Sequence, residues 1–231
     1  MAASCRTLQA VEQDRIAERG GLDAYDVARL LALSDGIFAI AMTLLVLDLP
    51  VPQLVRAGNA DLLSALDGLR ANFASFVLSF SIVGLNWLNH HRLFRGVARI
   101  DPRLMQLNLV QLLLICFVPF TAALLSRYGD LTTAVALYAG NVCLMGVVSA
   151  ITRVHLKRAD LLDHDPGPAQ FRLALAGSLA SSAVFAVSIA VAVWSPTVAE
   201  FVWIALIPLR FVVNRFAWIE RHAASLWPGK E

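Results

Sequence analysis

The chain has 231 residues, 58% of them hydrophobic and 16% charged, with a formal net charge of +2 at pH 7. A soluble domain carries about a quarter charged residues, so this composition argues against one, and the small net charge argues against a nucleic-acid-binding surface. The three cysteines show no paired spacing, which excludes a disulfide framework and a cysteine zinc site.

The hydrophobic residues gather in six blocks of membrane-span length. The blocks cover residues 30–49, 73–91, 107–125, 131–151, 173–194 and 198–214. About twenty helical residues cross the hydrocarbon core of a bilayer, and continuous apolar runs indicate helices. We therefore expect an all-α integral membrane protein with six transmembrane helices. The N-terminal segment covers 1–28 and has no apolar signal-peptide core, the helical domain covers 29–220, and a tail covers 221–231.

Basic residues are distributed unevenly between the connections of these helices. Sixteen of the nineteen Lys and Arg residues lie before the first block, after the second, after the fourth, or within and after the sixth. The positive-inside rule therefore predicts that both termini are cytoplasmic. We expect a multi-pass protein of a cell membrane, most simply the bacterial plasma membrane. The basic residues after the second block are expected to anchor to anionic lipid headgroups; they are Arg92, Arg95, Arg99 and Arg103.

The first block carries polar residues inside an apolar run. Residues 29–48 read RLLALSDGIFAIAMTLLVLD, with Ser34, Asp35 and Thr43 among apolar neighbours. An acid inside a membrane helix costs about 3 kcal/mol or more, so it marks a functional or tightly paired position. Asp48 lies at the predicted outer end, where it is either a solvated helix-end acid or a charge that concentrates cations at a pore mouth.

The helical period sorts the first block into faces. One stripe holds Gly36, Ile40, Thr43, Leu44 and Leu47, which follow one another at spacings of three and four. Asp35 points about 100° away from Gly36 on a helix and so leaves this stripe. An apolar stripe with one hydroxyl predicts either ordinary helix–helix packing or the lining of a pore.

The second block becomes polar toward its cytoplasmic end. That end carries Asn86, Trp87, Asn89, His90 and His91. By the predicted topology it lies at the same membrane depth as Ser34 and Asp35, and an acid there needs partners. We expect hydrogen bonds between the two clusters that fix the rotation of the first helix. The alternative is that the adjacent histidines only sit among lipid headgroups. Adjacent histidines point apart on a helix and are a poor metal pair.

The remaining segments carry weaker signals. Residues 53–70 predict an extracellular loop or a short interfacial helix, and 153–172 predict the longest cytoplasmic loop. The small residues of 173–194 indicate close helix packing, within the subunit or between subunits. Enzyme motifs such as GxSxG and HExxH do not occur, and neither does the TVGYG filter of common potassium channels. We therefore expect no enzyme, no cofactor and no metal site.

Three stretches resemble the transmembrane protein 175 family of potassium channels. They are RLLALSDGIFAIAMTLLVLDLPVP from residue 29, NWLNHHRLFR from residue 86 and LNLVQLLLICFVPFTAALL from residue 107. The family signature Arg-x-x-x-Phe-Ser-Asp matches Arg29, Ser34 and Asp35, with Leu33 in place of the phenylalanine. The resemblance covers about the first 130 residues.

The resemblance implies a homotetramer in a lipid bilayer, with the first helix of each subunit lining a central pore for K⁺. It implies apolar rings from Ile40, Leu44 and Leu47 and a hydroxyl ring from Thr43 that contributes to selectivity for potassium over sodium. It also implies a helix-anchoring role for Arg29, Ser34 and Asp35.

Two other functions stay open at the level of sequence. A proton-permeable or proton-coupled carrier needs an ionisable pair at a midplane site, which the sequence does not offer clearly. A non-conducting membrane scaffold would use the stripe of the first block for packing alone.

Overall fold

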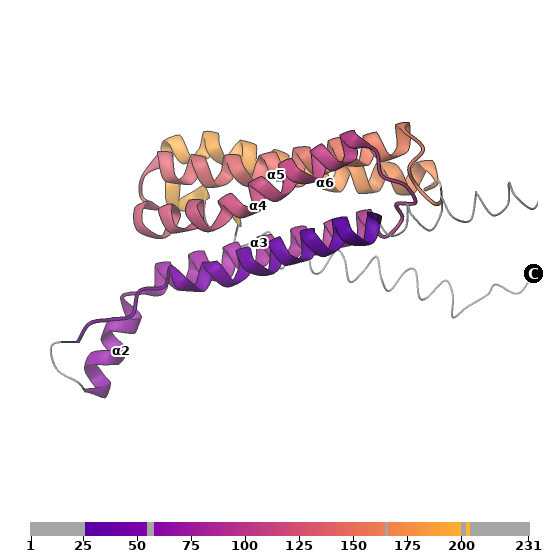
Figure 1. Ribbon diagram of the computed structural model, residues 1–231. Coiled ribbons are helices and arrows are strands. Elements are labelled where there is room, and N and C mark those ends of the chain that lie inside the picture. The colour runs from indigo at the N-terminus through magenta and orange to yellow at the C-terminus, as the bar shows by residue number, and fades with distance from the viewer. Residues whose placement is uncertain (1–25, 55–57, 165, 200–201, 204–231) are drawn as a thin grey trace, which may run out of the picture.

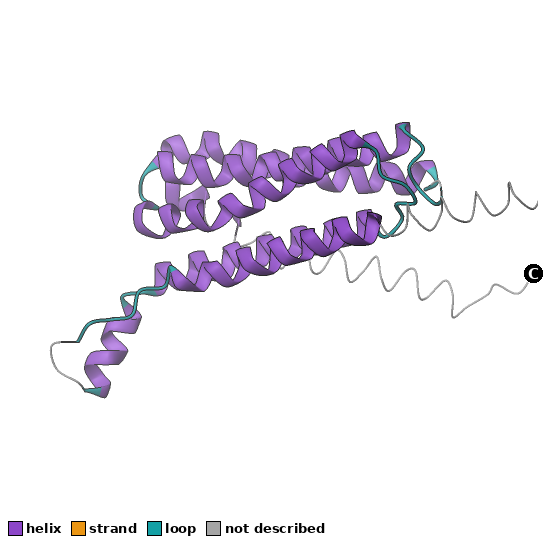
Figure 2. Cartoon of the chain, in the orientation of Figure 1, coloured by secondary structure: helices purple, strands orange, loops and turns teal. Residues whose placement is uncertain are grey.

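The computed structural model describes residues 26–54, 58–164, 166–199 and 202–203. Within them the chain forms helices joined by short connections (Figure 2). The first helix is Asp26–Leu47, and it is followed by α2 (Asn59–Asp67), α3 (Arg70–Phe94), α4 (Pro102–Tyr128), α5 (Thr132–Arg158) and α6 (Pro168–Trp194). The predictions for residues 1–25, for most of the block 198–214 and for the tail 221–231 lie outside the described residues.

All of these helices except α2 are long and apolar enough to cross a membrane. They correspond to the first five predicted blocks, so the all-helical membrane architecture is confirmed. The helix α2 is the helical alternative expected between 53 and 70. It has no buried residue, and it projects away from the bundle (Figure 1).

The predicted loop over 153–172 is wrong at both ends, because 153–158 belong to α5 and 168–172 to α6. α5 continues to Arg158, so only 159–167 connect it to α6. The basic residues of that stretch form the last turns of the helix, where cations interact favourably with the negative end of the helix dipole. A helix also remains hydrogen-bonded where its side chains become polar, so apolarity alone underestimates its length.

The first helix lies alongside α3, and α4, α5 and α6 form the rest of the bundle (Figure 1). The large central cluster of buried side chains includes Phe38, Val83, Ile115, Tyr138 and Trp203. A second cluster fills the end of the bundle where α3 and α5 finish, and it joins Leu30 to Phe94, Leu104 and Leu156. Both clusters bring the first helix together with later helices.

α5 and α6 approach each other closely because small residues face each other. Ser182 donates a hydrogen bond to the carbonyl of Cys143 at 3.1 Å. A Cβ added to Gly146 would lie 2.1 Å from Ser182 Oγ, so a larger residue there would require Ser182 or the helix to shift. The small residues of this region therefore serve packing within the subunit, which was one of the two predicted alternatives.

The two connections at the basic end of the bundle pair with each other through their backbones. Val97 and Leu162 form an isolated antiparallel bridge. The N–H of Ala98 donates to the carbonyl of Leu161, and the N–H of Asp163 donates to the carbonyl of Gly96, both at 2.9 Å. We call this pairing the loop clasp. It ties the end of α3 to the end of α5.

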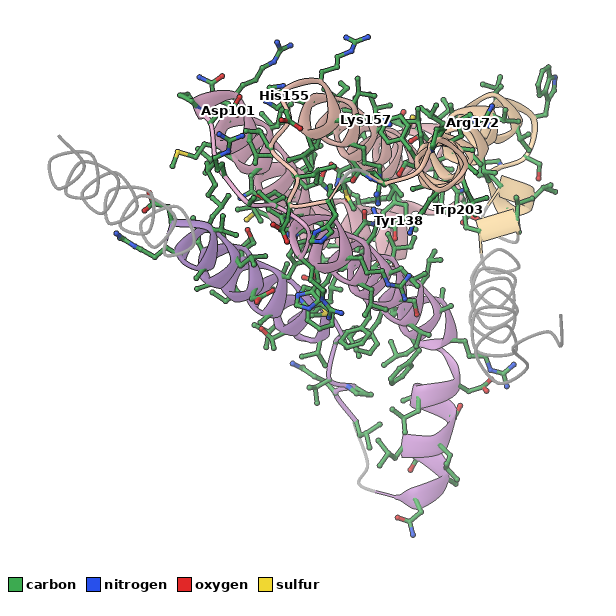
Figure 3. The ribbon with its side chains drawn as sticks, turned by 90° about the vertical axis from the view of Figure 1, so that its right-hand side faces the viewer. Asp101, Tyr138, His155, Lys157, Arg172 and Trp203 are labelled. Carbon is green, nitrogen blue, oxygen red and sulfur yellow. The ribbon has the colours of Figure 1, made fainter. Side chains whose placement is uncertain are left out.

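Asp101 adds a side-chain contact beside the loop clasp. Its carboxylate caps α4 by accepting from the N–H of Leu104 at 2.7 Å. The same carboxylate lies 2.8 Å from Nε2 of His155 on α5, and the two side chains lie together at one end of the bundle (Figure 3). One acid thus fixes the start of α4 against α5.

Candidate functional site

One face of the first helix is buried against the rest of the subunit. It carries Val27, Leu30, Ser34, Phe38, Ala41 and Leu45, again at spacings of three and four. The ring of Phe38 is fully buried and lies 5.5 Å from the ring of His90 on α3. Apolar side chains gain little from leaving lipid for protein, so polar contacts and close packing decide which face turns inward.

The opposite face of the first helix is not covered by the described residues. Ile40 is 60% exposed, Leu44 is 43% exposed and Leu47 is 75% exposed. Gly36 and Thr43 are exposed as well. The whole predicted stripe therefore lies on the face that the described residues leave uncovered, while Asp48, also exposed, lies just beyond the end of the helix.

Asp35 and Ser34 connect the first helix to its neighbours. Nε1 of Trp87 donates to Oδ1 of Asp35 at 2.8 Å. Asn108 on α4 donates through Nδ2 to Oγ of Ser34 at 3.1 Å. The Oδ1 atom of Asn108 lies 2.8 Å from Nε2 of His90. We call these five residues the anchoring network. Its hydrogen bonds join the first helix to both α3 and α4.

The network determines the direction of its hydrogen bonds. Ser34 donates its own proton to the carbonyl of Leu30 at 2.8 Å, so its oxygen can accept from Asn108. The amide oxygen of Asn108 is an acceptor, so His90 carries its proton on Nε2. The ring of His90 also stacks on Phe94, with centroids 4.3 Å apart. Each hydrogen bond of the network thus has a defined donor and a defined acceptor.

The remaining predicted members lie elsewhere. Asn86 donates to the carbonyl of Ile82 in its own helix at 3.0 Å. His91 stacks on Trp87 and lies 3.0 Å from Arg95, so it does not contact Asp35 in this network. Arg29 lies on the exposed side of the first helix. The direct bonds expected from Ser34 to α3 are replaced by a bridge, because the side chain of Asn108 lies between Ser34 and His90.

Asn108 is the member that sequence reasoning missed. Its polarity within the apolar block 107–125 is visible in the sequence, but its partners are 74 and 18 residues away. The predicted membrane depth that Ser34 shares with the polar end of α3 indicated that these two clusters meet, but it did not identify Asn108 as the residue between them. Over the described ranges, no three His, Cys, Asp or Glu residues come close enough to hold a metal ion.

The sequence of this chain is similar to those of known potassium channels. Residues 29–119 match the family model described as endosomal/lysosomal potassium channel TMEM175. A potassium channel of Streptomyces collinus is 45% identical over 100 residues, which are 43% of this chain and 48% of that protein. A potassium channel of Chamaesiphon minutus is 39% identical over 140 residues, which are 59% of this chain and 69% of that protein.

The chain belongs to the TMEM175 family. The fold of this chain supports that assignment. It matches the crystal structure of a lysosomal potassium-selective channel TMEM175 homolog from Chamaesiphon minutus with a TM-score of 0.71. That match has 30% sequence identity and covers 82% of this chain and 98% of the other. The TMEM175 family is one of membrane ion channels and not of enzymes. The family match includes the first helix, α3 and most of α4, and so contains the whole anchoring network.

Proposed function

We propose that this protein is a channel permeable to potassium and selective for potassium over sodium. Membership of the TMEM175 family supports this proposal, as do the potassium channels among its relatives. We further propose a homotetramer of six-helix subunits with both termini in the cytoplasm, in which four first helices surround a central pore.

The observation that carries the pore proposal is the division of the first helix into two faces. One face is held by the anchoring network, and the other presents Ile40, Leu44 and Leu47 to the outside of the subunit. A single helix cannot enclose a pore, but copies arranged around a closed rotation axis can. In such a ring the three side chains form stacked apolar constrictions.

Apolar constrictions of this kind provide a gate. A ring of leucine or isoleucine side chains offers no hydrogen bond to water, so a narrow ring loses its water and blocks ions. A small rotation or outward shift of the first helix widens the ring. Because the anchoring network sets that rotation, it is the natural place at which the closed and open arrangements differ.

Thr43 gives the ring its one polar layer. Its hydroxyl donates to the carbonyl of Ile40 at 2.8 Å. With the proton committed to the helix backbone, the lone pairs of the oxygen are available to a cation that has lost part of its water. We propose that four such oxygens contribute to the preference for potassium.

The test is a reversal potential, measured in planar bilayers with purified protein, potassium on one side and sodium on the other. A current that reverses toward the potassium equilibrium potential is the expected result. Thr43→Ala is expected to lower the potassium-to-sodium permeability ratio. Ser81→Ala is the matched control, because Ser81 is partly exposed and also donates to its own helix, to the carbonyl of Val77.

Other outcomes distinguish the alternatives. A current that follows the proton gradient identifies a proton pathway, and saturable flux without macroscopic current identifies a carrier. Folded, oligomeric protein with neither flux identifies a scaffold, in which the exposed stripe serves only packing. An unchanged permeability ratio in Thr43→Ala contradicts the selectivity role while leaving the channel intact.

A further inference from the structure

A cavity of about 530 Å³ opens at the basic end of the bundle, away from the anchoring network. Its walls come from the end of α3, the end of α5, the start of α6 and the connection 159–167, with no contribution from the first helix. Three arginines line it, namely Arg92, Arg95 and Arg153. Cavities of this size hold ligands as large as a lipid headgroup.

Arg153 is the most buried of the three arginines, and its hydrogen-bond partners among the described residues are neutral. Its Nε donates to Oγ of Ser178 at 3.3 Å, and its Nη2 donates to Oδ1 of Asn89. It forms no ion pair with any residue the structure describes. A partly buried guanidinium without an anion carries an uncompensated desolvation cost. A negatively charged ligand in the cavity would remove that cost.

Arg92 and Arg95 lie on the same side of the last turns of α3, three residues apart. Both are exposed, and Arg92 makes no hydrogen bond or ion pair with the described part of the chain. Arg95 is held by His91 through a 3.0 Å contact. The two side chains are thus the more exposed arginines of the cavity wall.

The start of α6 adds a further positive feature. Gln170 and Phe171, in its first turn, line the cavity. The N-cap Gly167 has no side chain to accept from the free N–H groups of that turn. The positive end of a 27-residue helix therefore faces the cavity without a side-chain cap. Together with the arginines this end favours an oxyanion.

The cavity wall also contains one acid. Oδ2 of Asp163 lies 3.0 Å from Nδ1 of His164, and the two side chains are 69% and 90% exposed. They form a solvent-exposed pair at the rim. Three guanidinium groups therefore outnumber the one carboxylate.

Apolar side chains complete the wall and indicate which anion fits. Leu93, Leu162 and Phe171 line the cavity, and Leu173, just beyond it on α6, is 74% exposed. A basic site with an apolar wall at the end of transmembrane helices matches a phospholipid, whose phosphate and acyl chains lie at neighbouring depths. We propose that this cavity binds the phosphoryl group of an anionic phospholipid through Arg92, Arg95 and Arg153.

The experiment uses the full-length protein in detergent, titrated with dioleoylphosphatidylglycerol and, separately, with dioleoylphosphatidylcholine. Native mass spectrometry measures the fraction of subunits with bound lipid. We expect the anionic lipid to bind more tightly than the zwitterionic one. Arg92→Gln and Arg153→Gln are each expected to weaken it about tenfold, the effect of one charge-assisted hydrogen bond. Arg158→Gln is the matched control, because Arg158 is exposed at the same end, in the last turn of α5, but does not line the cavity.

The control is expected to change binding by less than about twofold, since exposed charges outside a site are screened. Equal weakening by Arg158→Gln would show diffuse surface attraction and overturn the proposal, as would wild-type binding by both cavity variants. If Arg153→Gln fails to fold, Arg92→Gln decides alone. Excess inorganic phosphate distinguishes the sources: displacement of the lipid shows that the phosphoryl group suffices, and retention shows that the acyl chains are needed. This assay does not depend on conduction.

Discussion

Trp87 on α3 donates its indole N–H to the carboxylate of Asp35 at 2.8 Å. The contact gives Asp35, the acid of the first helix, a hydrogen-bond partner. Asp35 lies next to Gly36, where the exposed stripe begins. Asp35 lies to the side of that stripe, so its charge is directed into the subunit. We propose that this bond stops the first helix from rotating.

Replacing the indole tests this stop. Trp87→Phe keeps an aromatic ring but leaves Asp35 without its donor, and we expect a loss of stability of about 1–3 kcal/mol. Thermal unfolding followed by size-exclusion chromatography measures the loss. In Asp35→Asn the same tryptophan change should cost less, because the two residues act as a pair. Equal costs in both backgrounds would show that the bond does not stabilise the subunit.

The exposed stripe predicts a gain of conduction. Leu44→Ser replaces an apolar side chain of the proposed constriction with a hydroxyl that holds water, so we expect a larger potassium current per channel. Single-channel recording measures it. Leu173→Ser, at an exposed leucine of α6, is the control and should leave conductance unchanged. A reduced yield of folded oligomer from Leu44→Ser without any rise in current would support packing as the sole role of the stripe.

The contact of α5 with α6 predicts a glycine requirement. In Gly146→Ala the new methyl group would meet Ser182 Oγ at 2.1 Å, so Ser182 or the helix must shift. We expect destabilisation by about 1–3 kcal/mol, the usual cost of overpacking. Gly140→Ala is the control, because nothing lies within 4 Å of its added Cβ. Adding Ser182→Ala should recover part of the loss, and a melting temperature unaffected by Gly146→Ala would argue against the close contact.

Asp101 predicts a response to acid. Burial raises the pKa of its carboxyl, but the hydrogen bonds from His155 and Leu104 outweigh burial and hold that pKa below its usual value. The resulting stability is present above a pH of about 4 and is lost as the pH falls through the lowered pKa. Melting temperatures should therefore fall with acidification in this range, and less steeply in Asp101→Asn. Parallel curves for the two proteins would exclude this contribution.

Much of the fold followed from composition and helical period. Five apolar blocks became five helices, because a helix is the simplest way to satisfy a backbone in lipid. The end of α5 was misplaced, since polarity does not stop a helix outside the hydrocarbon region. The exposed stripe followed from spacings of three and four within one helix. The role of Asn108 did not, because it depends on which helices are neighbours, and no local pattern contains that information.

The loop clasp consists of main-chain hydrogen bonds between the segments around Val97 and Leu162. Every residue except proline supplies the same N–H and carbonyl groups, so the joint is indifferent to most side-chain replacements. Many substitutions in these two segments are therefore compatible with the same backbone hydrogen bonds. Insertions, deletions or prolines in either segment would break the loop clasp, and these are the changes that homologous chains should lack at both places together.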